Sequence, residues 1–220
     1  CLSAKCAHMT NSQIHITDRC DAFPGGELER LCDTRLSKES KSALLTRFKS
    51  VTRIHEKFVP KTLLTDRSDI TKKEIFLVCS TMGTGKTEMI MEYAKKFKKI
   101  LWISPRRVFA EALAKATGFH SYMDSKRDLY DHDRVIVSLE SIPRILRKFA
   151  SDHYKMQDYD LVVCDEWNAF MNVVCNDTLK DRYLHLKIFM NLVTAPHTAV
   201  VLTDAFFGEE VYFAVRRIPG

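Results

Sequence analysis

The sequence predicts an α/β domain in which about five parallel strands are covered by helices on both faces. From residue 74 onward, short runs rich in Val, Ile and Leu alternate with helical patterns. Near-continuous apolar runs of this kind are typical of strands buried on both faces of a parallel sheet. The chain has 220 residues, of which 45% are hydrophobic and 28% are charged. This is enough material for one good core and a small appendage.

The elements follow one another in a regular order. We expect strands at residues 74–80, 99–104, 134–138, 159–166 and 198–204, each followed by a helical pattern, at 86–98, 106–117, 139–150, near 178–193 and in an amphipathic stretch around Val211. Apolar positions between residues 37 and 58 recur at helical spacing and predict an amphipathic helix with a basic outer face. Residues 1–35 are polar, contain a turn-forming Pro-Gly-Gly and predict no regular element.

These patterns give a provisional division of the chain. We expect an irregular extension over residues 1–36, which could be the end of a preceding domain. One main domain then covers residues 37–217, with its core at 74–207. The chain begins with Cys rather than Met, so we expect it to be a piece of something longer.

Composition limits the class of protein. The net charge is +6 and the isoelectric point is about 8.9, a basic excess that suits a polyanionic partner but also fits many ordinary soluble proteins. The seven cysteines are odd in number and two lie in apolar runs, which favours buried thiols in a reducing compartment over a disulfide frame. We find no apolar run of membrane-spanning length and no signal segment, so no membrane partner is expected.

Two sets of metal-ligating residue types join no clear motif. Cys1, Cys6, His8 and Cys20 could be zinc ligands, but their spacing lacks the paired C-x-x-C pattern, so scattered thiols are favoured. Lone histidines such as His120, His132, His153 and His185 are interpreted as surface or satisfied core residues.

The stretch STMGTGKT follows the P-loop pattern, with Ser80 where the first Gly is usual. It lies between an apolar strand and a helix, where backbone N–H groups and the helix N-terminus can hold phosphate oxygens. An ordinary Gly turn is the alternative, and the coincidence of GKT, strand and helix favours phosphate binding. Ser80 is interpreted as a tolerated variant, because close backbone approach depends on the two glycines. The predicted nucleotide-binding residues are Ser80, Thr81, Met82, Gly83, Thr84, Gly85, Lys86 and Thr87.

A pair of carboxylates follows another buried strand. Four apolar residues precede Asp165 and Glu166 and bring them to the carboxyl edge of the predicted sheet, where open α/β folds bind ligands. We expect Thr87 and Asp165 to hold Mg²⁺, Lys86 to reach the phosphates of the nucleotide, and Glu166 to deprotonate the attacking water. A solvated strand end is the alternative interpretation.

The order of motifs resembles the first RecA-like domain of superfamily 2 helicases, with DEWN at 165–168 in place of the DEAD or DExx box. The segments WISPRRVFAEALA (102–114), TGFHSYMD (117–124), VIVSLESIPRI (135–145) and VVLTDAFF (200–207) are similar to those of herpesvirus-type origin-binding helicases of large DNA viruses. The match covers residues 74–207. It implies the ATP-binding lobe of a DNA helicase that acts in viral replication initiation.

The resemblance also implies roles for further residues. Ser104, Arg106 and Arg107 would contact the nucleic-acid backbone, and Arg suits phosphate because its guanidinium binds bidentately. Ser138 and Ser141 would add hydrogen bonds to that backbone. Thr203 and Asp204 stand at the third motif, which couples the nucleotide state to the grip on the strand. An exposed helix start is the alternative for the two arginines.

The implied partners are ATP with Mg²⁺, single-stranded or origin DNA, a second RecA-like domain absent from this chain, and other replication proteins. The implied location is a reducing compartment inside the cell, either the host nucleus or a cytoplasmic replication site. Neither Gln13 nor Gln157 has the spacing of an adenine-reading motif, so adenine recognition is unassigned. Two alternatives stay open: a DNA-packaging motor ATPase, and a nucleotide-gated DNA-binding module without turnover.

Overall fold

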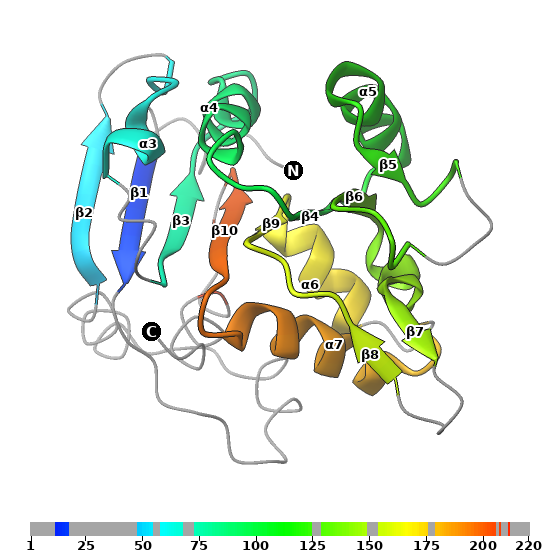
Figure 1. The fold of residues 1–220 in the computed structure, drawn as a ribbon. Coiled ribbons are helices and arrows are strands. Elements are labelled where there is room, and N and C mark those ends of the chain that lie inside the picture. Colours follow the sequence, from blue (N-terminus) through cyan, green and yellow to red (C-terminus); the bar gives the residue numbers. More distant parts are fainter. Residues whose placement is uncertain are drawn as a thin grey trace, which may run out of the picture. The chain divides into compact units, whose positions relative to one another are not determined.

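The structure is a computed structural model, and it describes residues 12–17, 48–54, 58–67, 73–124, 129–148, 154–175, 179–205, 207 and 211. The chain divides into two compact units, which are Cys1–Lys95 with Val201–Gly220, and Lys96–Val200. Figure 1 traces their elements in chain order. In the ranges just given, none of the helices has the length and apolar character needed to cross a membrane.

The first unit contains four neighbouring strands. Their order is β2 (Phe48–Ile54), β1 (Ser12–Thr17), β3 (Ile75–Cys79) and β10 (Ala199–Asp204), of which β10 belongs to this unit from Val201 on. β1 runs antiparallel to both β2 and β3. All five residues of β3 are buried, as its apolar sequence predicts. Two helices complete the described part of this unit: α3 (Leu63–Arg67) and α4 (Lys86–Ala94).

Two predictions for the N-terminal part are wrong. Residues 48–54 form β2 where we expected a helix, and residues 12–17 form β1 where we expected no regular element. The apolar residues Phe48, Val51 and Ile54 recur at a spacing that fits a helix, but β-branched residues among them also favour a strand. Strand pairing explains why residues 48–54 form a strand and not a helix. β1 lies between β2 and β3, and its Ile14 pairs with Thr52 on one side and with Val78 on the other.

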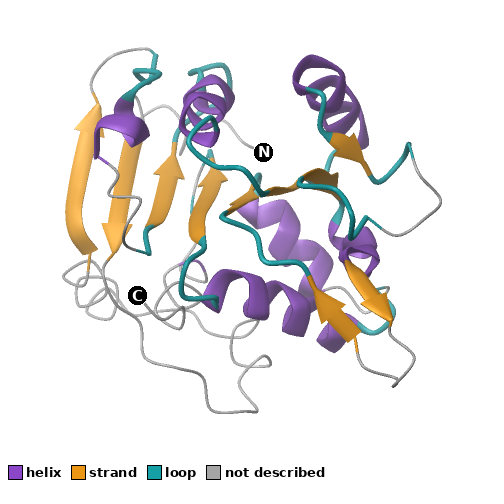
Figure 2. Cartoon of the chain, in the orientation of Figure 1, coloured by secondary structure: helices purple, strands orange, loops and turns teal. Residues whose placement is uncertain are grey.

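The second unit is a parallel sheet. Its strands lie in the order β9 (Leu161–Cys164), β4 (Ile100–Ile103), β6 (Arg134–Val137) and β5 (His120–Ser121), and every pair in this set runs parallel. Three helices accompany it: α5 (Arg107–Thr117), α6 (Trp167–Cys175) and α7 (Arg182–Thr194). In Figure 1 and Figure 2, α5 lies on one side of these strands and α6 and α7 lie on the other. The predicted parallel sheet with helices on both faces is confirmed for this unit.

The helix expected over residues 139–150 does not form. A 3₁₀ helix, η2 (Leu139–Ile145), leads into β7 (Leu146–Lys148), which pairs antiparallel with β8 (Tyr154–Met156). Pro143 lies inside η2 and has no N–H group to continue an α-helical ladder. The last predicted amphipathic stretch lies mostly outside the described residues, and only Phe207 and Val211 of it are placed, both buried.

Aromatic side chains join α6 to α7. Phe170 and Phe189 have ring centroids 4.5 Å apart, and Trp167 stacks on Phe170 at 5.4 Å. All three side chains are almost fully buried. The sequence predicted α7 from its periodicity but not α6, which begins directly after the Asp165–Glu166 pair.

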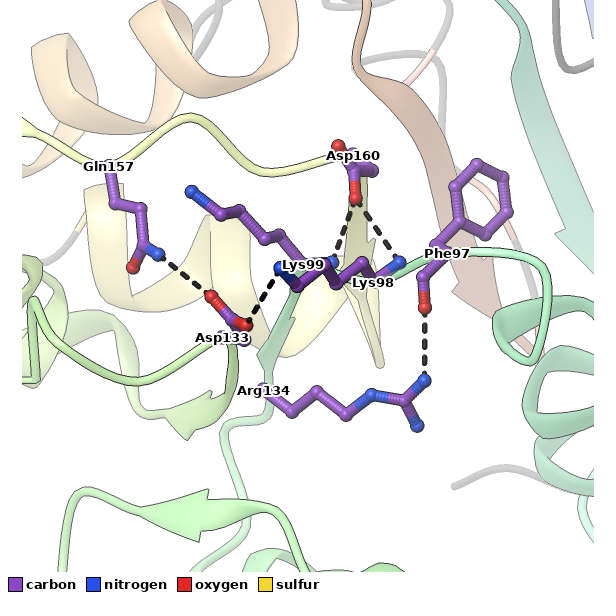
Figure 3. A network of polar contacts seen from close by, with 7 residues as sticks. All are labelled: Phe97, Lys98, Lys99, Asp133, Arg134, Gln157 and Asp160. Carbon is purple, nitrogen blue, oxygen red and sulfur yellow. Dashed lines mark hydrogen bonds and ion pairs between the residues drawn. The ribbon is translucent and has the colours of Figure 1, made fainter.

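A polar network fixes the amino ends of the strands in the second unit (Figure 3). Asp160 Oδ2 accepts hydrogen bonds from the backbone N–H groups of Lys98, at 3.2 Å, and Lys99, at 2.8 Å. Asp133 accepts a hydrogen bond from Gln157 Nε2 at 3.3 Å. The other members are Arg134, which donates to Phe97 O at 3.0 Å, and the Lys98–Asp133 ion pair at 3.9 Å. The network therefore connects the chain just before β4, β6 and β9.

Asp160→Ala should lower the free energy of unfolding by about 1.5–3 kcal/mol, because two backbone N–H groups lose a charged acceptor. Urea denaturation of the wild type and the variant measures this difference. The control is Asp158→Ala, since Asp158 is exposed and should change stability by less than about 0.5 kcal/mol. Equal stability of the two variants would contradict this role for Asp160.

Candidate functional site

The loop between β3 and α4 has the backbone that its glycines predict. Gly83 has φ 74° and Gly85 has φ 87°, both in the left-handed region that glycine adopts without strain. A Cβ at Gly83 would meet no atom within 4 Å, and one at Gly85 would lie 3.8 Å from Val59 O. The backbone conformation, not lack of space, therefore requires glycine at these positions.

Ser80 has a structural role that the sequence did not reveal. It is buried at 3% exposure, and its Oγ lies 2.5 Å from Thr84 Oγ1 across the loop. Thr84 Oγ1 donates to Thr81 O at 2.9 Å, so Ser80 is the donor in the shorter contact. Val59 N donates to Thr84 O at 2.8 Å and ties the loop to the preceding segment. Ser80 is thus part of the loop's internal hydrogen bonding, not merely a tolerated variant.

Lys86 begins α4 and turns its side chain back over the loop. Its Nζ donates to the carbonyl oxygens of Ser80 and Thr81, the latter at 2.9 Å. Thr87 follows in the first turn of α4 and is half-buried, and Met82 at the tip of the loop is 75% exposed. The ammonium group and the first turn of α4 therefore lie at the same loop, an arrangement that suits an anion.

The end of β10 lies beside the start of this loop. Ser80 N donates to Asp204 O at 2.9 Å. Thr203 is fully buried, and Asp204 is half-buried. The structure therefore brings the two predicted coupling residues next to the predicted phosphate loop, within the first unit.

Burial raises the pKa of the Cys79 thiol above its ordinary value. Cys79 is the last residue of β3 and is 5% exposed. Its Sγ lies 3.6 Å from Ala205 O, just after β10. The thiol directly before the loop is therefore held in its neutral form.

The acidic pair lies in the second unit, at the carboxyl end of β9. Asp165 N donates to Ile103 O at 2.9 Å, which continues the pairing of β9 with β4. Glu166 has φ 57°, a left-handed conformation that is strained for a residue with a side chain. Phe170 N donates to Glu166 O at 3.1 Å, so α6 begins at this strained residue.

The predicted nucleic-acid contacts lie at the same edge of the second unit. Ser104 is buried, and its N–H donates to Val137 O at 2.9 Å. Arg106 is the N-cap residue of α5 and Arg107 is its first residue, with side chains 59% and 74% exposed. Ser138 follows β6, and its hydroxyl donates to Ser141 Oγ at 3.1 Å.

One contact joins two predicted groups. Arg106 Nε lies 2.7 Å from Glu166 Oε2, so the predicted nucleic-acid contact is paired with the predicted base. Arg107 instead pairs with Glu111 on its own helix, at 3.4 Å. No local pattern predicted the first contact, because Arg106 and Glu166 are 60 positions apart in the chain and the pairing of β4 with β9 brings them together.

The histidines behave as expected where they are described. His185 is buried, and its two ring nitrogens lie 3.0 Å from Asp181 O and 3.3 Å from Glu140 O. His120 and His132 stack on each other, with centroids 3.6 Å apart. No cluster of three His, Cys, Asp or Glu side chains in the described part of the chain could hold a metal ion. Outside that part lie His153 and the four zinc candidates, Cys1, Cys6, His8 and Cys20.

Comparison with known proteins gives a family match over most of the chain. The family model described as "Origin of replication binding protein" matches residues 30–210. A protein of Acanthamoeba polyphaga mimivirus, named as a replication origin-binding protein, is 39% identical over 107 residues, which are 46% of this chain and 14% of the relative. A second protein of that virus, named as helicase R8, is 40% identical over 120 residues, which are 51% of this chain and 11% of the relative.

A third relative comes from a herpesvirus. The replication origin-binding protein of varicella-zoster virus (strain Dumas) is 26% identical over 118 residues, which are 49% of this chain and 13% of the relative. The chain thus spans between 11% and 14% of the length of these curated relatives.

Cys79 should resist alkylation by iodoacetamide at pH 8, because burial raises its pKa and keeps the thiol protonated. The neutral thiol stabilises the fold below the ordinary thiol pKa, and this contribution is lost as the pH rises through the raised value. Peptide mass spectrometry measures how fast Cys79 is labelled in the native and in the guanidinium-unfolded protein, at pH 8 and at higher pH. Labelling of native Cys79 at the unfolded rate at pH 8 would contradict the structure.

Proposed function

The chain belongs to the origin of replication binding protein family, and from this premise we propose that it is the ATP-binding lobe of a DNA helicase. The helicase would act in viral replication initiation. The observation that carries the proposal is the loop of residues 80–87, in which two left-handed glycines and the Lys86 ammonium would form a site for phosphate. Relatives named as origin-binding proteins and as a helicase support it.

The loop suits the phosphates of ATP. Lys86 Nζ already lies against two carbonyl oxygens of the loop, and phosphate oxygens are stronger acceptors for the same ammonium group. Open space beside Gly83 leaves room for a ligand to approach the backbone closely. For Mg²⁺, the Thr87 hydroxyl and the Asp165 carboxylate are the hard oxygen donors that this ion prefers. When bound, Mg²⁺ would neutralise charge on the phosphates.

Glu166 would act as the general base. Its carboxylate is half-buried next to Asp165 and would take a proton from the water that attacks the terminal phosphate. Consecutive carboxylates suit hydrolysis by water better than transfer to a small acceptor, because one can serve the metal while the other serves the water.

Nucleic acid would bind at the carboxyl edge of β4 and β6. Arg106 and Arg107 are exposed at the start of α5, where the helix N-terminus also favours phosphate. Ser104, Ser138 and Ser141 would add hydrogen bonds to the sugar-phosphate backbone. We propose single-stranded or origin DNA as the polymer.

Coupling would run through the end of β10. The Ser80 N–H to Asp204 O hydrogen bond connects the phosphate loop directly to the third motif, with Thr203 buried next to it. A second RecA-like domain and other replication proteins would complete the motor. The buried thiols of Cys79 and Cys164 suit a reducing compartment, such as the host nucleus or a cytoplasmic replication site.

The decisive experiment compares the ATPase rate of the full-length protein with and without single-stranded DNA. DNA should stimulate turnover, and Glu166→Gln should lower the stimulated rate by about 10²–10⁴-fold, because the substitution removes the general base. Lys95→Ala is the control, since Lys95 is exposed beyond the end of α4 and pairs with Glu92. A DNA-independent rate that survives Glu166→Gln would contradict the proposal.

Ser80→Ala should weaken binding of Mg-ATP by about two- to ten-fold, because the loop loses one internal hydrogen bond. Thr84→Val removes the other partner of that contact. Titration with a fluorescent ATP analogue should show that the double variant loses less than the sum of the two single losses. Fully additive losses would show that the contact does not organise the loop.

A further inference from the structure

The ion pair of Arg106 with Glu166 connects two functions that the sequence placed in separate motifs. Arg106 follows β4 and Glu166 follows β9, and these strands are hydrogen-bonded neighbours whose last paired residues are Ile103 and Cys164. Arg106 therefore lies three residues beyond the paired end of β4, and Glu166 lies two residues beyond the paired end of β9. The resulting Nε to Oε2 distance is 2.7 Å, with side chains 59% and 31% exposed.

The backbone around this pair is specific. Glu166 adopts a left-handed φ of 57°, which is strained for a residue other than glycine. Such strain persists where the surrounding structure holds the residue, and it is concentrated at functional and switching sites. Arg106 has an extended backbone, with φ −104° and ψ 113°. Its side chain therefore projects from the chain just before the first turn of α5.

The same guanidinium suits both a carboxylate and a phosphate. Arg binds either group through its planar fork of N–H donors. While Glu166 Oε2 accepts from Arg106, that oxygen does not take a proton from water. A DNA phosphate would therefore compete with Glu166, the proposed base, for the Arg106 guanidinium.

We propose that Arg106 is a positioning residue that holds Glu166 in the absence of DNA and releases it when a DNA phosphate binds. The Arg106–Glu166 ion pair breaks, an Arg106–phosphate ion pair forms, and the freed carboxylate can accept the proton of the attacking water. This inference rests on the proposed function and adds to it a physical route by which DNA stimulates ATP hydrolysis.

Competition works in both directions. If DNA displaces Glu166 from Arg106, then Glu166 must weaken DNA binding by the same free energy. The pair is partly exposed, and exposed ion pairs have small energies. The effect on DNA affinity should therefore be about two- to five-fold.

The test measures binding of a fluorescent single-stranded oligonucleotide to the nucleotide-free full-length protein by anisotropy. Glu166→Gln should bind about two- to five-fold more tightly than the wild type, since the competing charge is removed. Arg106→Gln should bind more weakly, and the double variant should match Arg106→Gln alone. The control is Asp131→Asn, because Asp131 pairs with Arg147 in the same unit and its removal changes the net charge equally.

A second measurement separates release from structural damage. Arg106→Gln should raise the DNA-free ATPase rate by about two- to five-fold, since Glu166 is no longer held. A substitution that only damaged the fold would lower that rate instead. Arg147→Gln is the matched control, because it breaks an Arg–Asp ion pair in the same unit and should leave the DNA-free rate unchanged.

The outcomes distinguish this inference from the function on which it rests. A wild type that neither binds single-stranded DNA nor hydrolyses ATP faster in its presence would overturn both. If the wild type binds DNA and is stimulated, but Glu166→Gln gains no more affinity than Asp131→Asn, only the inference is overturned. A gain in affinity that survives in the double variant, or an unchanged DNA-free rate in Arg106→Gln, would also overturn it.

Discussion

The parallel pairing of β4 with β6 and β9 is the constraint on which the second unit depends. Ile103 pairs with Val137 on one side and with Cys164 on the other. Three buried strands therefore end at one level, and the residues that follow them emerge at one edge. Crevices outside the carboxyl ends of parallel strands are where open α/β sheets bind ligands. A sheet with a shifted register would separate these residues, whatever their chemistry.

Much of the central fold could be predicted because its signals are local. The strands β3, β4, β6, β9 and β10 coincide with runs of buried Val, Ile and Leu, which need no knowledge of their partners to be recognised. The left-handed conformations of Gly83 and Gly85, in the loop between β3 and α4, could also be predicted locally, because a residue with a side chain would be strained there.

Other features depend on partners far away in the chain. β1 and β2 form because each pairs with a neighbour, and apolar spacing in a single window cannot show a partner. The cross-loop bond of Ser80 and the ion pair of Arg106 with Glu166 need side-chain geometry and strand order. α6 was missed because its start coincides with the strained backbone of Glu166, where no N-cap residue signals a helix.

The polar network of Figure 3 holds the amino ends of the strands, at the edge opposite the candidate site residues of this unit. Asp160 and Arg134 bond to backbone atoms at the amino ends of the strands, so they hold the strand ends whatever side chains stand at positions 98, 99 and 97. This edge of the sheet can therefore accept side-chain changes at positions 97–99 without losing these hydrogen bonds, whereas a change at Asp160 or Arg134 removes them.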